Sequence, residues 1–366
     1  MTRKYALWQA RQWLPLAGII LVVFLVCYLS SSALANVDIS YPEYGYGTVD
    51  YPATNLDWLL VPAIIATLIV PFFVYSYRFS PNAADAFLQL PFKKAVLKRI
   101  RLLLGLAAIL IPFAISFWLG VGIMAIRQTG LAYSFHYEWF AAAFAFSMVL
   151  LAAGYFASCF LVSLGNGRLD AALALLVGQT ILMLSVSPLL YFAAKYTAVP
   201  GFSLAFETLC FYAPEALTGY FFADLIVKGT FAPAELYPTE VWLGAIIIYT
   251  VLFTVLGLAA ALWQLLTADP SGENMGRKGY ASPLGTAMPH AMMIQTAFLL
   301  AATLLYANMH SQDITSILVV SIAWALGYYI LLALGNRSFA IRRKDLVGSG
   351  IVASGYVVLL LATAFT

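Results

Sequence analysis

Nine apolar stretches, each long enough to cross a membrane as a helix, recur along this 366-residue chain. A bilayer core of about 30 Å requires about 20 predominantly apolar residues per helix. The stretches cover residues 13–35, 57–77, 102–126, 138–164, 171–195, 241–266, 291–309, 315–335 and 347–365. The pattern predicts an all-α, polytopic membrane helix bundle with about nine transmembrane helices.

Composition excludes several other classes of protein. The chain is 63% hydrophobic and only 10% charged, whereas soluble domains are nearer half apolar. Because no basic stripe alternates with exposed aromatic residues, nucleic acid is not an expected partner. The three cysteines are an odd set, which predicts neither a disulfide framework nor a metal site.

The positions of the basic residues predict the orientation. With a cytoplasmic N-terminus, sixteen of the nineteen Lys and Arg residues fall on the cytoplasmic side. Only Arg127, Lys195 and Lys228 fall outside. This distribution follows the positive-inside rule and predicts a multi-pass protein of the cell membrane, that is, the inner or plasma membrane. Trp58 and Trp13 are expected to be interfacial anchors at an outer and an inner helix end.

The interiors of the apolar stretches bear on the mechanism of any transport. None contains an Asp, Glu, Lys or Arg well inside it. Ion- and proton-coupled carriers usually bind their coupling charge near the middle of the membrane, so a self-powered carrier is disfavoured. Gln179 and Ser185 help to make the fifth stretch the most polar, which is more typical of interhelical hydrogen bonds than of a substrate site.

The segment between the fifth and sixth stretches is unusually apolar for a loop. Residues 214–227 place Leu217, Phe221 and Leu225 near one helical face. We expect interfacial or re-entrant helices at 202–227, on the outer side.

The loop between the second and third stretches carries six of the positive charges and a predicted short helix. Ser80 can cap this helix, and Pro81 suits its first position because the missing N–H costs nothing there. Leu90 and Pro91 end it, and a second helix runs from Lys93 into the membrane.

Two interpretations of this short helix follow from its residues. Ala84, Phe87 and Leu88 share an apolar face, and Asp85 lies near the positive end of the helix dipole. An exposed apolar face could receive a partner protein. The helix could equally lie on lipid headgroups, with the basic residues of the loop against anionic lipid. The residues alone leave both interpretations open.

A family resemblance favours the partner. The segment AADAFLQLP at 83–91, followed by basic residues and an apolar helix, resembles the S-A-D-x-x-x-S-L-P segment of bacterial ABC-2-type transporter permeases. The match is carried by Ala84, Asp85, Leu90 and Pro91. Ala83 and Gln89 stand where the pattern has Ser.

A weaker likeness lies in the inner loop after the sixth stretch. The segment GENMG, with Glu273 and Gly276, is similar to an S-E-x-A-G-like stretch of the same family. The order of the stretches is also similar. The resemblance implies an ABC-2-like transmembrane domain at 1–270 with a six-helix core, and C-terminal transmembrane helices at 271–366.

The resemblance further implies a permease subunit of a peptide, drug or lipid exporter. A separate cytoplasmic ATPase would bind the ATP and magnesium, leaving this chain with no cofactor of its own. A second permease copy or a paralogue would complete the path, with membrane lipid around it. The sequence has no G-x-x-x-x-G-K-[ST] phosphate loop, which agrees with an external motor.

The implied contacts with the ATPase fall in a coupling helix at 81–91. The residues concerned are Ala84, Asp85, Phe87, Leu88, Leu90 and Pro91. Phe87 and Leu88 would fill a groove of the ATPase, unless they pack under their own helices, and Asp85 would meet a basic residue of the ATPase. Glu273 and Gly276 would form a second contact.

Two other functions remain as alternatives. A membrane-embedded enzyme would need clustered catalytic groups, but His136, His290 and His310 are scattered singly and form no H-x-x-x-H pair. A non-transporting scaffold or sensor subunit would use the same loop helix for docking.

Overall fold

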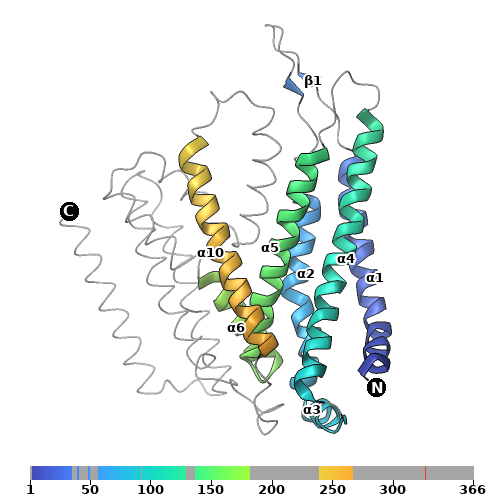
Figure 1. The fold of residues 1–366 in the computed structure, drawn as a ribbon, viewed down its shortest axis with the longest axis vertical. Helices are drawn as coiled ribbons and strands as arrows, with labels where there is room; N and C mark the ends of the chain where they lie inside the picture. Colours follow the sequence, from blue (N-terminus) through green and yellow to red (C-terminus); the bar gives the residue numbers. More distant parts are fainter. Residues whose placement is uncertain are drawn as a thin grey trace, which may run out of the picture. The chain divides into compact units, whose positions relative to one another are not determined.

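The computed structural model describes residues 2–34, 39–40, 48–49, 57–91, 93–128, 137–181, 239–266 and 326. Helices make up most of these residues (Figure 1). They are α1 (Thr2–Leu34), α2 (Asp57–Val74), α3 (Pro81–Leu88), α4 (Lys94–Gln128), α5 (Tyr137–Ser163), α6 (Arg168–Ile181) and α10 (Thr239–Leu266), with a 3₁₀ turn η2 at Ser76–Arg78. The prediction of a helical protein is therefore confirmed for this part of the chain.

A small hairpin between α1 and α2 departs from the all-α prediction. Strand β1 (Ile39–Ser40) pairs antiparallel with β2 (Thr48–Val49), so that Ile39 lies opposite Val49. Strands of two residues carry too little alternation to be seen in a hydrophobicity pattern.

Three of the described helices are long and apolar enough to cross a membrane. The candidate spans are Lys4–Leu29, Lys94–Ile123 and Ala143–Ser163, while Trp58–Val74 and Thr254–Leu266 are apolar but shorter. These helices fit a membrane protein. The predicted helices at 202–227, 291–309, 315–335 and 347–365 lie outside the described residues, apart from residue 326, so the total of nine stays a prediction.

Two helices extend beyond the apolar stretches that predicted them. α1 begins at Thr2 instead of residue 13, and α4 begins at Lys94, directly after the loop. Their first turns are rich in Lys, Arg, Ala and Leu, which are strong helix formers, so nothing in the sequence ends the helix at the edge of the apolar stretch. The prediction that a long helix begins near Lys93 is confirmed, and its residues Lys94–Ile123 form one of the candidate spans.

The chain divides into two compact units. The first contains the described residues 2–77, 85–160 and 239–266, and the second contains residues 78–84 and 161–181. The expected boundary between residues 270 and 271 lies outside the described residues and stays a prediction.

In the first unit, α1, α2 and α4 pack against one another, and α10 packs against α4 (Figure 1). The start of α4 meets the end of α10, and Tyr75, directly after α2, also contacts the end of α10. We call this end of the first unit the basic end, because the cations of α4's first turns lie there. α2 and α10 end at the basic end and α4 begins there, which matches the in-and-out order predicted from charge.

Further from the basic end, α4 and α5 share a layer of aromatic rings. The Phe144 ring centroid lies 5.2 Å from that of Phe117, 5.5 Å from that of Trp118 and 6.3 Å from that of Phe113. Nearer the basic end, the buried Tyr155 hydroxyl donates a hydrogen bond to the Leu102 carbonyl oxygen at 2.8 Å.

Glycines allow these helices to approach closely. A Cβ at Gly120 of α4 would overlap the Tyr28 ring of α1, and one at Gly257 of α10 would meet the backbone of Ala153. Small residues at such crossings let helices pack by van der Waals contact, the main attraction between helices in lipid.

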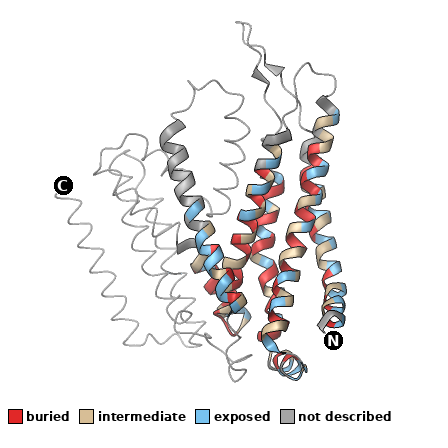
Figure 2. Cartoon of the chain, viewed as in Figure 1, coloured by how far each residue is buried: buried red, intermediate tan, exposed pale blue. Residues whose placement is uncertain are grey.

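The outward faces of the helices are apolar. Exposed stretches alternate with buried ones along the described helices (Figure 2). On α2, five large apolar side chains follow one another at helical spacing and are exposed. They are Trp58, Val61, Ile65, Ile69 and Phe73. An exposed stripe of this kind suits a lipid environment, in which apolar side chains need no cover.

The second unit contains a tight turn between α5 and α6. The Gly165 N–H donates to the Val162 carbonyl oxygen, and a Cβ at Gly165 would meet the backbone of Ala171. Arg78 is buried and donates a hydrogen bond to the Ser163 carbonyl oxygen at the end of α5, at 2.8 Å. A cation in this position stabilises the negative end of the helix dipole.

Candidate functional site: helix α3 and the basic end

Helix α3 has the capped, Pro-bounded form that the sequence predicts. The Ala83 N–H donates to Ser80 Oγ at 3.3 Å, which satisfies one of the free donors of the first turn. Pro81 is the first helical residue, and the helix ends at Leu88, so that Pro91 lies beyond it. The predicted extent of 81–91 is thus three residues too long at its C-terminal end.

The apolar face of α3 is turned inward. Ala84 is 2% exposed and Phe87 is 6% exposed. The expectation that this face is open to a partner is therefore wrong for these two residues. The sequence shows that a face is apolar, but only the tertiary structure shows whether the protein itself covers it.

The outward face of α3 is mostly polar. The exposed residues share one side of the helix and the turn after it, at spacings of three and four residues. They are Asn82, Asp85, Ala86 and Gln89. Asp85 lies beyond the first turn of α3, so its carboxylate gains little from the helix dipole and is presented to the surroundings. We call these four residues the α3 outer face.

Phe87 is held by Tyr77, which the sequence analysis did not single out. The two rings stack with centroids 4.0 Å apart and planes 20° apart. Tyr77 is itself 4% exposed. An aromatic residue four positions before the start of α3 was the available signal, but the nine residues between Tyr77 and Phe87 contain a turn whose geometry no sequence pattern specifies.

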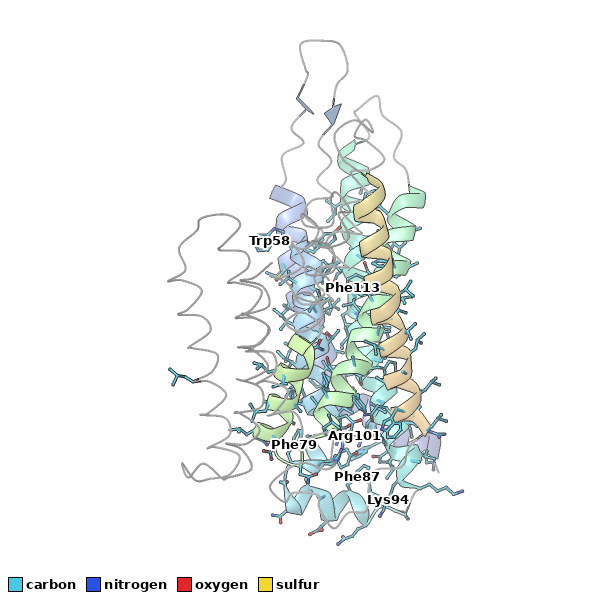
Figure 3. All side chains as sticks on the ribbon, turned by 90° about the vertical axis from the view of Figure 1, so that its left-hand side faces the viewer. Trp58, Phe79, Phe87, Lys94, Arg101 and Phe113 are labelled. Carbon is cyan, nitrogen blue, oxygen red and sulfur yellow. The ribbon has the colours of Figure 1, made fainter. Side chains whose placement is uncertain are left out.

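Arg101 of α4 contacts the Tyr77 ring that stacks on Phe87. Its guanidinium carbon lies 5.0 Å from the centroid of the Tyr77 ring, within the range of a cation–π interaction. Its Nη2–H donates to Ser76 Oγ at 3.3 Å. Phe87, Tyr77 and Arg101 therefore form a continuous cluster that joins α3, η2 and α4. Figure 3 shows Phe87, Lys94 and Arg101 at one end of the first unit and Trp58 towards the other.

The end of α10 is attached to the same region. Arg99 Nε–H donates to the Leu265 carbonyl oxygen at 2.8 Å, in the last turn of α10. The Tyr75 hydroxyl donates to Gln264 Oε1 at 2.6 Å. Because Tyr75 directly follows α2, these two bonds connect the ends of α2 and α10 with the start of α4.

The remaining predicted site residues are not brought together. Leu90 is half-buried and Pro91 is exposed. The side chain of Leu88 lies outside the described residues, as do Glu273 and Gly276. Within the described ranges, no three His, Cys, Asp or Glu residues gather as they would around a metal ion. Neither Cys27 nor Cys159 is in a disulfide bond, and Cys210 lies outside the described residues.

The arrangement is suited to transmitting movement. A displacement of α3 would act on Tyr77 through the stacked Phe87 ring, and on α4 through Arg101. From there the Arg99 and Tyr75 hydrogen bonds reach α10. Comparison with protein-family models, with curated proteins and with solved structures finds no match for this chain.

Proposed function

We propose that this chain is the transmembrane permease subunit of an ABC-type exporter, driven by a separate cytoplasmic ATPase that docks on α3. The observation that carries the proposal is the construction of α3. It is a short, capped helix between apolar helices, with a polar outer face and an inner face stacked on Tyr77. A docking helix needs both an accessible surface and a firm connection to the helices that it moves.

The α3 outer face is the proposed contact surface. Asp85 would accept charge-assisted hydrogen bonds from a Lys or Arg of the ATPase, and Asn82 and Gln89 would add neutral ones. This changes the roles of the predicted residues: Phe87 and Ala84 transmit movement from inside, and Asp85 makes the contact. Leu88, Leu90, Pro91, Glu273 and Gly276 keep their proposed partner contacts as predictions.

ATP and Mg²⁺ would bind to the ATPase. Closure of the ATPase on ATP would move α3 towards or away from the membrane. The Phe87–Tyr77–Arg101 cluster would then tilt the inner parts of α2 and α4. Two copies of the chain, or one copy and a paralogue, would enclose the path. An amphipathic or hydrophobic substrate suits such a path, since the described helices carry apolar and aromatic side chains along most of their length.

The test is purification of the full-length chain from its native membrane, with assay of the associated ATP hydrolysis. The Asp85→Arg variant should lose the ATPase partner by more than tenfold, because removing one member of a desolvated charge pair costs about 2–5 kcal/mol. The control is Arg168→Asp. It inverts an exposed charge that is predicted to lie on the same side of the membrane as α3. An Asp is well tolerated at this position because it is the first residue of α6.

The outcomes separate the alternatives. A permease loses both ATPase binding and export in Asp85→Arg and keeps both in the control. A scaffold loses binding without losing export, and an enzyme retains its activity as a purified single chain. A wild-type preparation without any nucleotide-binding partner would overturn the proposal.

A further inference from the structure

The first turns of α1 have two faces of different character. Tyr5, Gln9 and Trp13 follow one another at intervals of four residues and are buried. The opposite face carries three exposed residues: Lys4, Trp8 and Arg11. Trp13 is therefore not the interfacial anchor that the sequence suggested. Trp8, which is 53% exposed and whose ring centroid lies 5.9 Å from that of Tyr5, occupies that role.

Helix length places this exposed face in the headgroup layer. From Gln12 to Leu29, α1 rises about 27 Å, which is close to the thickness of a bilayer core. The turns from Lys4 to Arg11 add about 12 Å, at the level of the lipid phosphates and glycerols. On α4, the residues from Leu102 to Ile123 likewise rise about 33 Å, so Arg101 is the last cation before the core.

The positive charge on these two helices is not balanced within them. α1 and α4 pack against each other, and neither contains an Asp or a Glu. Arg99 and Arg101 are engaged with Leu265, Ser76 and Tyr77 of the protein. Lys4 and Arg11 of α1 are exposed instead, as is Lys94 of α4, so these cations can receive an anion from outside.

The same face of α1 continues as an apolar stripe. Beyond Arg11, Leu14 is exposed, and Ile19, Val22 and Val26 follow at spacings of three and four residues and are exposed as well. Leu7, which is 58% exposed, lies between the two cations. An occupant of the whole face must therefore be anionic at one end and apolar along the rest. A phospholipid has this form, whereas an acidic peptide would leave the stripe unmatched.

We propose that the Lys4–Trp8–Arg11 face of α1 binds an anionic phospholipid from the leaflet at the basic end. The phosphate accepts hydrogen bonds from the Lys4 ammonium and the Arg11 guanidinium. The Trp8 indole lies at the glycerol level, and the acyl chains lie along Leu14 and Val22. This interaction is independent of the proposed transport function.

The probe is phosphatidylglycerol, added to the purified full-length chain in a neutral detergent, with bound lipid counted by native mass spectrometry. The Lys4→Gln/Arg11→Gln variant should bind phosphatidylglycerol about 25-fold more weakly, since each cation contributes about fivefold at an anionic surface. The matched control is Lys93→Gln/Arg168→Gln, which removes two other exposed cations. It should change binding less than twofold.

Further arms identify the ligand. The Lys4→Arg/Arg11→Lys variant should restore binding to within about threefold, and size-exclusion chromatography should show that all variants remain folded. Phosphatidylcholine should bind at least tenfold more weakly than phosphatidylglycerol. Equal losses in the test and control variants, equal binding of phosphatidylcholine, or full displacement of the lipid by millimolar inorganic phosphate would each overturn the proposal.

Discussion

The aromatic layer of α4 and α5 and the basic end of the first unit are held together in different ways. In the layer, rings pack on rings and Tyr155 supplies a hydrogen bond to the α4 backbone. At the basic end, the contacts are a stacked pair, a cation–π interaction and hydrogen bonds to the end of a helix. Close packing has few alternative arrangements, whereas polar contacts at helix ends can exchange with water or a partner. The layer is therefore suited to stay fixed while the basic end moves.

The largest expected effect comes from removing the ring that connects α3 to this end. Phe87→Ala should lower the free energy of unfolding by about 3 kcal/mol, because it leaves a cavity beside Tyr77. The measurement is thermal unfolding in detergent, together with protease cleavage within α3. The control is Phe73→Ala on α2, which is 48% exposed. If both variants behave alike, the inward packing of Phe87 does not contribute to stability.

Two glycines two residues apart on α4, and therefore on different faces of the helix, test the close packing above the basic end. Gly120→Ala should destabilise by about 1–3 kcal/mol, because the new methyl group overlaps the Tyr28 ring. Gly122→Ala meets nothing within 4 Å and should be neutral or slightly stabilising. Thermal unfolding of the two purified variants gives the comparison. A larger loss in Gly122→Ala would contradict the assigned packing of α1 on α4.

The hydrogen bond between Tyr155 of α5 and the α4 backbone should contribute less to the free energy of unfolding than the close packing at Gly120. Tyr155→Phe removes the interhelical donor to the Leu102 carbonyl oxygen, together with a hydrogen bond to Cys159 of the same helix. Interhelical hydrogen bonds in membrane proteins contribute about 0.6 kcal/mol on average and up to about 1.7 kcal/mol. We expect a loss within this range in equilibrium unfolding. A loss above about 3 kcal/mol would show that the hydroxyl supports more than these two bonds.

The smallest expected effect is at the end of α10. Arg99→Gln should cost about 0.3–1 kcal/mol, since it removes a cation from the C-terminal end of the helix dipole, and the cost should shrink at high salt. The control is Lys94→Gln, which removes a cation from the N-terminal end of α4 and should cost nothing. Unfolding at low and at high salt distinguishes the two. A salt-independent loss in Arg99→Gln would exclude the dipole as its cause.

Much of the described fold could be predicted from the sequence. The helices at 57–77, 102–126, 138–164 and 241–266 correspond to α2, α4, α5 and α10. Ser80 and Pro81 predicted the start of α3, because capping is a local property of a few consecutive residues. The early start of α1 could not be read from the apolar stretch, since the polar turns before it also favour a helix.

The candidate site was predicted only in part. Asp85 was identified, and the structure leaves it exposed. Phe87 was expected to be exposed but is buried, and Tyr77 was missed. Both results depend on which surface covers α3, and that surface consists of residues that are not adjacent in the sequence.

The sequence by itself determined that the described part of the chain forms long apolar helices that fit a membrane protein, because apolar length is a property of consecutive residues. It also determined where α3 begins. The tertiary structure decided which face of α3 points outward, that Arg99 and Arg101 contact helix ends and rings, and that Lys4 and Arg11 remain open. Those outcomes depend on contacts between distant segments, such as Tyr75 with Gln264, which the hydrophobicity pattern of either segment does not contain.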